Sequence, residues 1–307
     1  MGAFHCPVGS AFYEDEPCID CGLCLATTEE DMALASRRVR DYLRSQAEVK
    51  KGSGRKIAVC GKGGTGKSTI VALMANAFWG LKYSVLVLDT DESNTGLDRM
   101  LGFARQSKPI MALWQRFPSG ETKSRADWLN QRGIFFQDIP AEYVLARDNL
   151  RFLSTGKIAE PFQGCACSMA ELAGDLARKL VLRDKEIVLM DTEAGVESFG
   201  RGVERGADTV LIAVEPSSES LALAEKIFYM ADGLGIKQVR VILNKVPSEK
   251  VEARVLEEVE RKKMKVIGSL YLDSQISDAS LEGKAPSGDS SAQKAMKEIA
   301  TRLLTET

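Results

Sequence analysis

One glycine-rich octapeptide constrains this chain more than any other stretch of its sequence. The residues GKGGTGKS, from Gly61 to Ser68, fit the pattern GxxxxGK[ST], and they lie between the apolar run KIAVC and the helical pattern TIVALMANAFW. A strand, a glycine loop and a helix in this order form a P-loop, whose backbone N–H groups converge on phosphate oxygens at the positive end of the helix. The sequence therefore predicts binding of ATP or GTP.

The polar side chains of this loop have separate expected tasks. Lys67 reaches the β and γ phosphates, and Ser68 ligates Mg²⁺. The residues expected to contact the nucleotide are Gly61, Lys62, Gly63, Gly64, Thr65, Gly66, Lys67, Ser68 and Thr69. ATP with Mg²⁺ is therefore the expected cofactor.

Beyond the loop, short apolar runs alternate with helix-length segments. The strand-like runs are KIAVCG, SVLVLDT, EIVLMDTEAG, DTVLIAVEP, VRVILNKV and KVIGSLYLD. This alternation indicates a mostly parallel sheet buried on both faces, the doubly wound α/β fold class of P-loop NTPases. The final pattern, SSAQKAMKEIATRLLTET, predicts a packed terminal helix rather than one that binds a membrane.

The expected domain organisation is a small N-terminal unit followed by a large one. Residues 1–50 hold a cysteine-rich segment, a helix capped by Thr27 or Thr28, and the start of a flexible linker. Residues 55–307 form the P-loop ATPase domain. Residues 103–165 interrupt the strand–helix rhythm, and their role is open between docking a client protein and packing on the sheet.

Composition excludes several classes of partner. The 41 basic and 43 acidic residues nearly balance, so neither nucleic acid nor an anionic membrane is expected to bind. The apolar runs are shorter than the roughly 20 residues of a membrane helix, and no signal-peptide layout opens the chain. We therefore expect a cytoplasmic protein.

The seven cysteines are clustered in a pattern that favours metal ligation over disulfides. Near the N-terminus, Cys18, Cys21 and Cys24 form a CxxCxxC motif, with Cys6 as a fourth candidate ligand. This spacing is similar to half of a bacterial ferredoxin motif and predicts a [4Fe–4S] cluster. Zinc and unrelated thiols are the alternatives.

A second cysteine pair, Cys165 and Cys167, lies in QGCACSM. In an extended segment these side chains point to the same side and present both thiols to one metal ion. A tetrahedral site needs four ligands, and two copies of the chain would supply them at a two-fold axis. Two buried core cysteines are the alternative, which is also our interpretation of Cys60 inside a strand-like run.

The early lysine of the loop, Lys62, makes it resemble the deviant Walker A loop of the MinD, ParA and nitrogenase-iron-protein superfamily. The resemblance covers most of residues 55–300, and it implies that Lys62 reaches across an ATP-dependent homodimer to the partner's nucleotide. LDTDES resembles the first switch, which implies that Asp91 orients the attacking water. LMDTEAG and ILNKV imply Asp191 near magnesium and Asn244 on the adenine base.

Each of these roles has a plainer alternative from the residues themselves. Asp89 and Asp91 at a strand end are also suited to capping a helix. Asn244 is also suited to an ordinary turn.

Three further segments resemble the CooC family of nickel-insertion ATPases for carbon monoxide dehydrogenase: GKIAEPFQGCACS, DTEAGVESFGRG and YLDSQISDASLEGKAP. The resemblance implies a homodimeric ATPase that holds Ni²⁺ or Zn²⁺ between subunits and delivers metal to a client nickel enzyme, such as carbon monoxide dehydrogenase or acetyl-CoA synthase. The N-terminal cysteines depart from that family. They leave open an ATP-gated electron donor resembling the nitrogenase iron protein, with a shared iron–sulfur cluster at the CxC pair. A positioning ATPase of the MinD/ParA type is a third, less favoured alternative.

Overall fold

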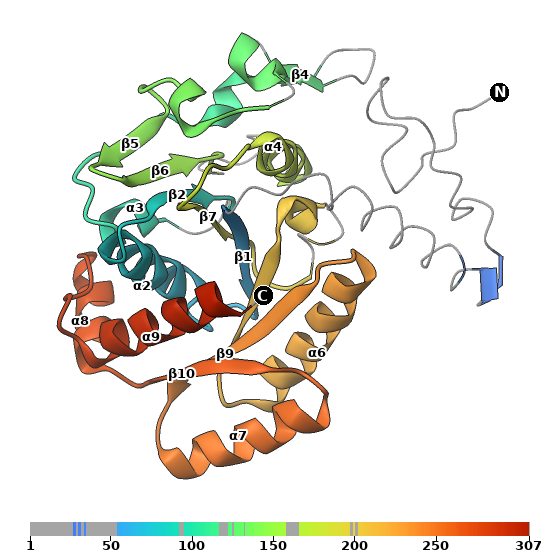
Figure 1. The fold of residues 1–307 in the computed structure, drawn as a ribbon, viewed down its shortest axis with the longest axis vertical. Helices are drawn as coiled ribbons and strands as arrows, with labels where there is room; N and C mark the ends of the chain where they lie inside the picture. The colour runs from blue at the N-terminus through green and yellow to red at the C-terminus, as the bar shows by residue number, and fades with distance from the viewer. Residues whose placement is uncertain are drawn as a thin grey trace.

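The computed structural model of the 307-residue chain describes residues 27–28, 30–31, 34, 54–91, 95–116, 122–124, 126–131, 133–157, 166–196, 199 and 202–306. Its centre is an eight-stranded sheet (Figure 1). The strands are β1 (Arg55–Gly61), β2 (Ser84–Asp89), β5 (Val144–Arg147), β6 (Leu150–Ser154), β7 (Glu186–Asp191), β8 (Thr209–Val214), β9 (Gln238–Val246) and β10 (Val266–Tyr271). Their order is β10-β9-β8-β1-β7-β2-β6-β5.

The sheet confirms the predicted fold class. The six strand-like runs become β1, β2, β7, β8, β9 and β10, and all of them pair in parallel. β6 also pairs in parallel with β2, whereas the edge strand β5 runs antiparallel to β6. The sheet is therefore mostly parallel, with one antiparallel edge.

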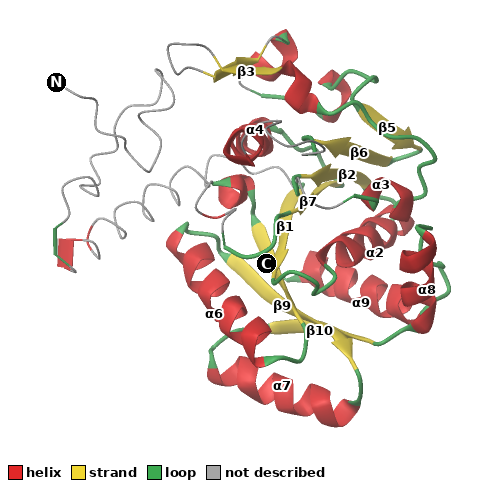
Figure 2. Ribbon diagram, turned by 180° about the vertical axis from the view of Figure 1, so that it is seen from behind, coloured by secondary structure: helices red, strands yellow, loops and turns green. Residues whose placement is uncertain are grey.

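Helices cover both faces of the sheet (Figure 2). The α-helices are α2 (Lys67–Gly80), α3 (Leu97–Met100), α4 (Ala166–Lys179), α6 (Ser218–Gly233), α7 (Glu249–Arg261), α8 (Ser274–Glu282) and α9 (Ser291–Thr305). The shorter 3-10 helices are η2 (Ile110–Leu113), η3 (Asp127–Asn130), η4 (Phe136–Asp138) and η5 (Val203–Gly206). A separate hairpin pairs β3 (Trp114–Arg116) with β4 (Thr122–Ser124).

The two faces of the sheet form two separate cores. Alternate residues of β1 divide between them: Ile57 belongs to the core with α2 and α9, and Ala58 to the core with α4, α6 and α7. This division follows from the opposite directions of successive side chains in a strand. Helix α2 packs between the sheet and α9, which explains why its sequence is apolar on nearly every side.

The terminal helix packs as predicted. Its apolar residues Ala292, Met296, Ile299 and Leu303 are all buried in the core that contains α2. Nowhere in the part of the chain that the structure describes does a helix combine the length and apolar character needed to cross a membrane.

The region without a firm assignment contributes to the sheet and to one core. β5 and β6 extend the sheet beyond β2, and Ile110, Leu129, Ile134 and Phe136 are buried in the core that includes α4. Its described residues thus pack on the sheet, as one of the two alternatives expected.

Little of the N-terminal unit lies within the described residues. The expected helix cap is present, because Thr28 Oγ1 accepts a hydrogen bond from the Asp31 N–H at 3.1 Å, and Asp31 Oδ2 accepts one from the Thr28 N–H at 3.2 Å. The four cysteines of the expected cluster lie outside the described residues: Cys6, Cys18, Cys21 and Cys24. The cluster therefore stays a prediction.

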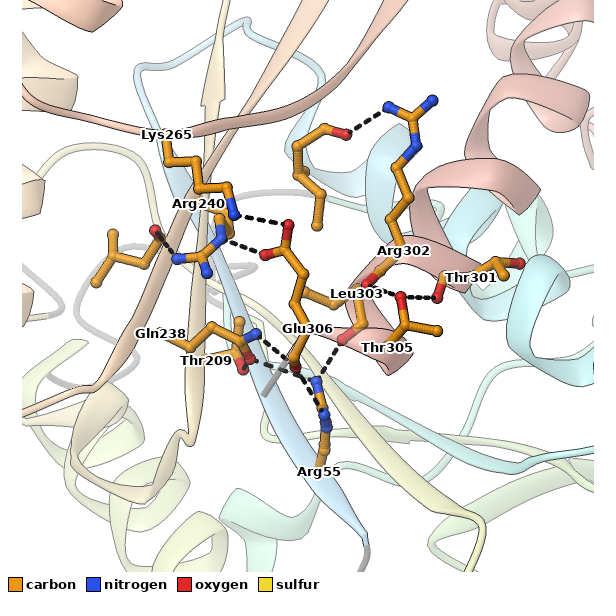
Figure 3. A network of polar contacts seen from close by, with 12 residues as sticks. Arg55, Thr209, Gln238, Arg240, Lys265, Thr301, Arg302, Leu303, Thr305 and Glu306 are labelled. Atoms are coloured by element: carbon orange, nitrogen blue, oxygen red, sulfur yellow. Dashed lines mark hydrogen bonds and ion pairs between the residues drawn. The ribbon is translucent and has the colours of Figure 1, made fainter.

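Hydrogen bonds and ion pairs of Glu306 connect the residue after α9 to the sheet (Figure 3). The Glu306 carboxylate accepts hydrogen bonds from Arg240 Nε at 2.6 Å and pairs with Lys265 Nζ at 2.9 Å. Its backbone carbonyl accepts from the side chains of Arg55 and Gln238, both at 3.1 Å. The network links the residue after α9 to β1 and β9.

We expect Glu306→Gln to destabilise the protein by about 1–2 kcal/mol, because a part-buried carboxylate loses two cationic partners. Urea unfolding at pH 7 measures the change. Burial opposes ionisation of Glu306, but hydrogen bonds from Lys265 and Arg240 outweigh burial and lower its pKa. This stabilisation is thus present above the pKa of the unfolded chain and disappears as the pH falls through the folded pKa.

The matched control for this variant is Glu282→Gln, which removes the exposed pair between Glu282 and Lys284. Exposed pairs contribute little, so we expect a change much smaller than that of Glu306→Gln. Equal losses for the two variants would show that the network around Glu306 has no special contribution to stability.

Candidate nucleotide-binding site

The P-loop lies where the strand order of the sheet reverses. β1 leads into the loop between its two neighbours β7 and β8, which belong to opposite halves of the sheet. β2 and β7 end at the same level, with Asp89 opposite Asp191. Ligands of doubly wound folds bind at this point, outside the carboxyl ends of the strands.

Three glycines of the loop, Gly61, Gly64 and Gly66, have a positive φ that disfavours a side chain. Gly66 has a φ of 85°, and a Cβ placed there would lie 2.5 Å from Asn244 Nδ2. Gly64 has a φ of 82°, and an added Cβ would meet nothing within 4 Å among the described residues. Gly66 is thus closely packed, whereas Gly64 faces open space.

The N-terminus of α2 is suited to an anion. The N-cap of α2 is Gly66, which has no side chain to accept hydrogen bonds from the first N–H groups of the helix. The first turn of α2 also contains no acidic residue. The first N–H groups of a helix need acceptors, and phosphate oxygens supply them. Thr65 Oγ1 donates to the Lys62 carbonyl at 2.8 Å, which closes the loop.

Ser68 and Asp191 form a site with the donor chemistry of magnesium. Ser68 Oγ donates to Asp191 Oδ2 at 2.6 Å. Asp191 is fully buried, and its Oδ1 has no hydrogen-bond partner in the described part of the molecule. Burial, with a further contribution from the Asp89 charge, raises the pKa of Asp191 to about 7. A buried carboxylate with an unused oxygen beside a hydroxyl fits a hard cation such as Mg²⁺.

Asp89 and Asp91, in the segment that resembles the first switch, are both buried, at 2% and 5% exposure. Burial raises the pKa of Asp89 to about 6, although Lys157 Nζ lies 2.7 Å from Asp89 Oδ2. Among the described residues, neither aspartate caps a helix, because the next helix there, α3, has Gly96 as its N-cap. The described helices therefore give the helix-cap alternative no support, and the role of Asp91 toward water stays a prediction.

Asn244 lies inside β9, so the alternative of a turn residue is wrong. Its Nδ2 donates to the Thr65 carbonyl at 2.7 Å and thereby supports the P-loop. Lys62 is 38% exposed, with its Nζ 3.7 Å from Glu215 Oε1 of the same chain. Contact of Asn244 with the base and of Lys62 with a partner's nucleotide stay predictions.

Several supporting contacts were not anticipated from the sequence. Thr90 Oγ1 donates to the Asp191 carbonyl at 2.7 Å, Thr192 Oγ1 to the Val59 carbonyl at 2.9 Å, and the Gly195 N–H to the Gly61 carbonyl at 3.1 Å. For the two threonine contacts, the sequence does offer a signal, because each threonine directly follows a buried strand. The Lys157 contact had no signal, because it comes from the region without an assignment.

The cysteine pair requires one correction. Helix α4 begins at Ala166, so Cys167 lies in its first turn and not in the extended segment that we expected. The apolar spacing of Met169, Leu172 and Ala173 explains the helix, since all three are buried. Cys165 and the side chain of Cys167 lie outside the described residues.

Cys60 is a core residue, as interpreted from the sequence. It is fully buried, with its Sγ 3.8 Å from Glu204 Oε1. Burial, followed by the Glu204 charge, raises the pKa of the Cys60 thiol well above its usual value. A protonated thiol is a poor metal ligand. Among the described residues, no three His, Cys, Asp or Glu side chains gather around a possible metal position.

The fold and the site define a P-loop ATPase. The CobQ/CobB/MinD/ParA nucleotide-binding domain matches residues 56–286, and the chain belongs to this family.

Two relatives share much of the sequence of this chain, and one solved structure shares its fold. An uncharacterized ATP-binding protein of Methanocaldococcus jannaschii is 38% identical over 252 residues, which cover 80% of this chain and 100% of that protein. The carbon monoxide dehydrogenase accessory protein CooC of Rhodospirillum rubrum is 34% identical over 235 residues, or 74% of this chain and 88% of CooC. The septum site-determining protein MinD of Pyrococcus horikoshii, complexed with Mg-ADP, has a TM-score of 0.62 at 18% identity and covers 81% and 96% of the two chains.

Proposed function

We propose that this ATPase is a metallochaperone that serves the maturation of a nickel enzyme of the carbon monoxide dehydrogenase or acetyl-CoA synthase type. The observation that carries the proposal is the 34% identity to a protein named as a carbon monoxide dehydrogenase accessory protein, over 74% of this chain. In this proposal the nickel enzyme is the client, and Ni²⁺ or Zn²⁺ at the CxC pair is the cargo.

Residues of the P-loop and of the strand ends perform the ATPase step. The backbone N–H groups before α2 and the Lys67 ammonium bind the phosphates. Ser68 and Asp191 hold the magnesium ion, which neutralises charge on the phosphates when bound. Asp91, directly after β2, orients the attacking water, and Asn244 contacts the adenine while it supports the loop.

Dimerisation completes both functional sites. The Lys62 side chain is partly exposed and its pair with Glu215 is long, at 3.7 Å, so little free energy is needed to release it toward a partner's nucleotide. Two copies of Cys165 and Cys167 would supply four thiolates to one ion. ATP alters metal affinity only if the two dimer states bind the ion differently, and that difference is the basis of delivery.

The N-terminal cysteines support a second candidate function. Cys6, Cys18, Cys21 and Cys24 are spaced for a [4Fe–4S] cluster in a chain that also holds an ATPase. An ATP-gated electron donor would use this cluster together with a shared cluster at Cys165 and Cys167. The metallochaperone is preferred because it is the function that agrees with the CooC relative.

Anaerobic purification with metal analysis and electron paramagnetic resonance tests the proposal. We expect about one nickel or zinc ion per dimer, lost in Cys165→Ser/Cys167→Ser because no other thiols complete the site. An iron–sulfur signal should be lost only in Cys18→Ser/Cys21→Ser. The buried Cys60→Ala variant is the matched control and should keep both metals.

Two other outcomes would change the assignment. Full metal content in Cys165→Ser/Cys167→Ser would exclude the shared site. An iron–sulfur signal abolished by that same variant would favour the electron donor.

A further inference from the structure

Lys157, just after β6, contacts the first switch region at two points. Its Nζ lies 2.7 Å from Asp89 Oδ2 and also donates to the backbone carbonyl of Asp91. The Lys157 side chain is 24% exposed and that of Asp89 is 3% exposed, so water competes weakly for this pair. A lysine ammonium has three donors, which allows both contacts at once.

The end of β2 is hydrogen-bonded to residues at the ends of both neighbouring strands, β6 and β7. The Thr155 N–H and Oγ1 donate to the Asp89 carbonyl, both at 3.0 Å. The Thr90 N–H and Oγ1 donate to the Asp191 carbonyl at 3.0 and 2.7 Å. Lys157 extends this support by one residue, to Asp91, where the chain has left the strand.

Lys157 places a cation beside a group of acidic side chains. The carboxylates of Asp89 and Asp191 end two paired strands directly opposite each other, and Asp91 follows Asp89 by two residues. Lys157 offsets the buried charge of Asp89 while its second contact holds the Asp91 backbone. Removal of one partner of a buried pair leaves the other charge without compensation.

We propose that Lys157 is a positioning residue for ATP hydrolysis. It holds the Asp91 backbone where the chain leaves β2 and thereby fixes the place from which Asp91 orients the attacking water. The role of Asp91 toward water, on which this inference rests, belongs to the proposed function.

The proposal is tested with Lys157→Met, Lys157→Arg and Lys157→Met/Asp89→Asn. We expect Lys157→Met to lower kcat by about 10–100-fold, because small displacements of catalytic groups have effects of this size. The Kd for a non-hydrolysable ATP analogue should stay within about twofold, since the P-loop is untouched. Lys157→Arg should restore most of kcat, and the double variant should stay slow although it carries no unpaired charge.

The matched control is Lys108→Met, which breaks the exposed pair between Lys108 and Glu142. This variant should keep the wild-type kcat. An unchanged kcat in Lys157→Met would overturn the positioning role. Full recovery in the double variant would also overturn it, because neutralisation of Asp89 would then be the only task of Lys157.

The kcat of the Lys157 variants decides the positioning role, whereas nickel binding by the wild-type chain decides the proposed function.

Discussion

Replacement of Lys67 with Gln should lower ATP hydrolysis by about 10²–10³-fold, the loss found when one preorganised charge-stabilising donor is removed from an active site. Lys67 is the first residue of α2 and is only 7% exposed, and its ammonium is the expected partner of the β and γ phosphates. Gln keeps most of the side-chain length but removes the charge. Phosphate release at saturating Mg-ATP measures the effect.

The matched control for Lys67→Gln is Lys226→Gln on α6, where the lysine is exposed. This second variant should hydrolyse ATP at the wild-type rate. Normal hydrolysis by Lys67→Gln would refute the assignment of the nucleotide site.

Asp191→Asn should lower Mg²⁺-dependent hydrolysis by about 10–100-fold, the usual effect of losing a supporting ligand around a metal. Asn has the same shape and still accepts the Ser68 hydrogen bond, so the loss would come from charge. Hydrolysis measured across a range of Mg²⁺ concentrations should reach half of its maximum at a higher Mg²⁺ concentration than in the wild type. Wild-type magnesium affinity would contradict the assignment.

The same variant should stabilise the nucleotide-free protein at alkaline pH. Burial first, and the Asp89 charge second, raise the pKa of Asp191 from 3.8 to about 7. The folded state therefore binds a proton more tightly than the unfolded chain, and its stability falls as the pH rises from about 4 to about 7. Asn avoids this loss, so its advantage in melting temperature should be absent near pH 4 and largest above pH 7.

Much of the fold follows from the sequence because buried parallel strands have an unmixed apolar pattern. The runs that became β1, β2 and β7 are of this kind, with five or more buried residues each. β5 and β6 were not recognised, because β5 is four residues long and half exposed, and β6 carries Arg151. An edge strand with one solvent-facing side lacks the pattern that identifies a central one.

Site residues that belong to one contiguous motif could be predicted from the sequence. Residues that meet only in the folded chain could not. The P-loop is a contiguous motif, so Lys67 and Ser68 could be identified directly. Asp191 ends a strand that pairs with β1, and its place followed from the family pattern. Lys157 could not be predicted, since its contact with Asp89 joins residues 68 positions apart through β6, a strand that sequence patterns did not show. Cys167 was misplaced because apolar spacing in α4 extends its helix to Ala166.

The central claim is that two chains share one metal ion at Cys165 and Cys167 and that ATP changes how tightly it is held. The most direct test is a nickel titration of the metal-free wild-type protein with and without a non-hydrolysable ATP analogue. The molecular mass of the protein is measured in parallel to give the number of chains in each complex. We expect one nickel ion per two chains and an affinity that differs by about tenfold between the two conditions. One ion per single chain, or equal affinity with and without nucleotide, would contradict it.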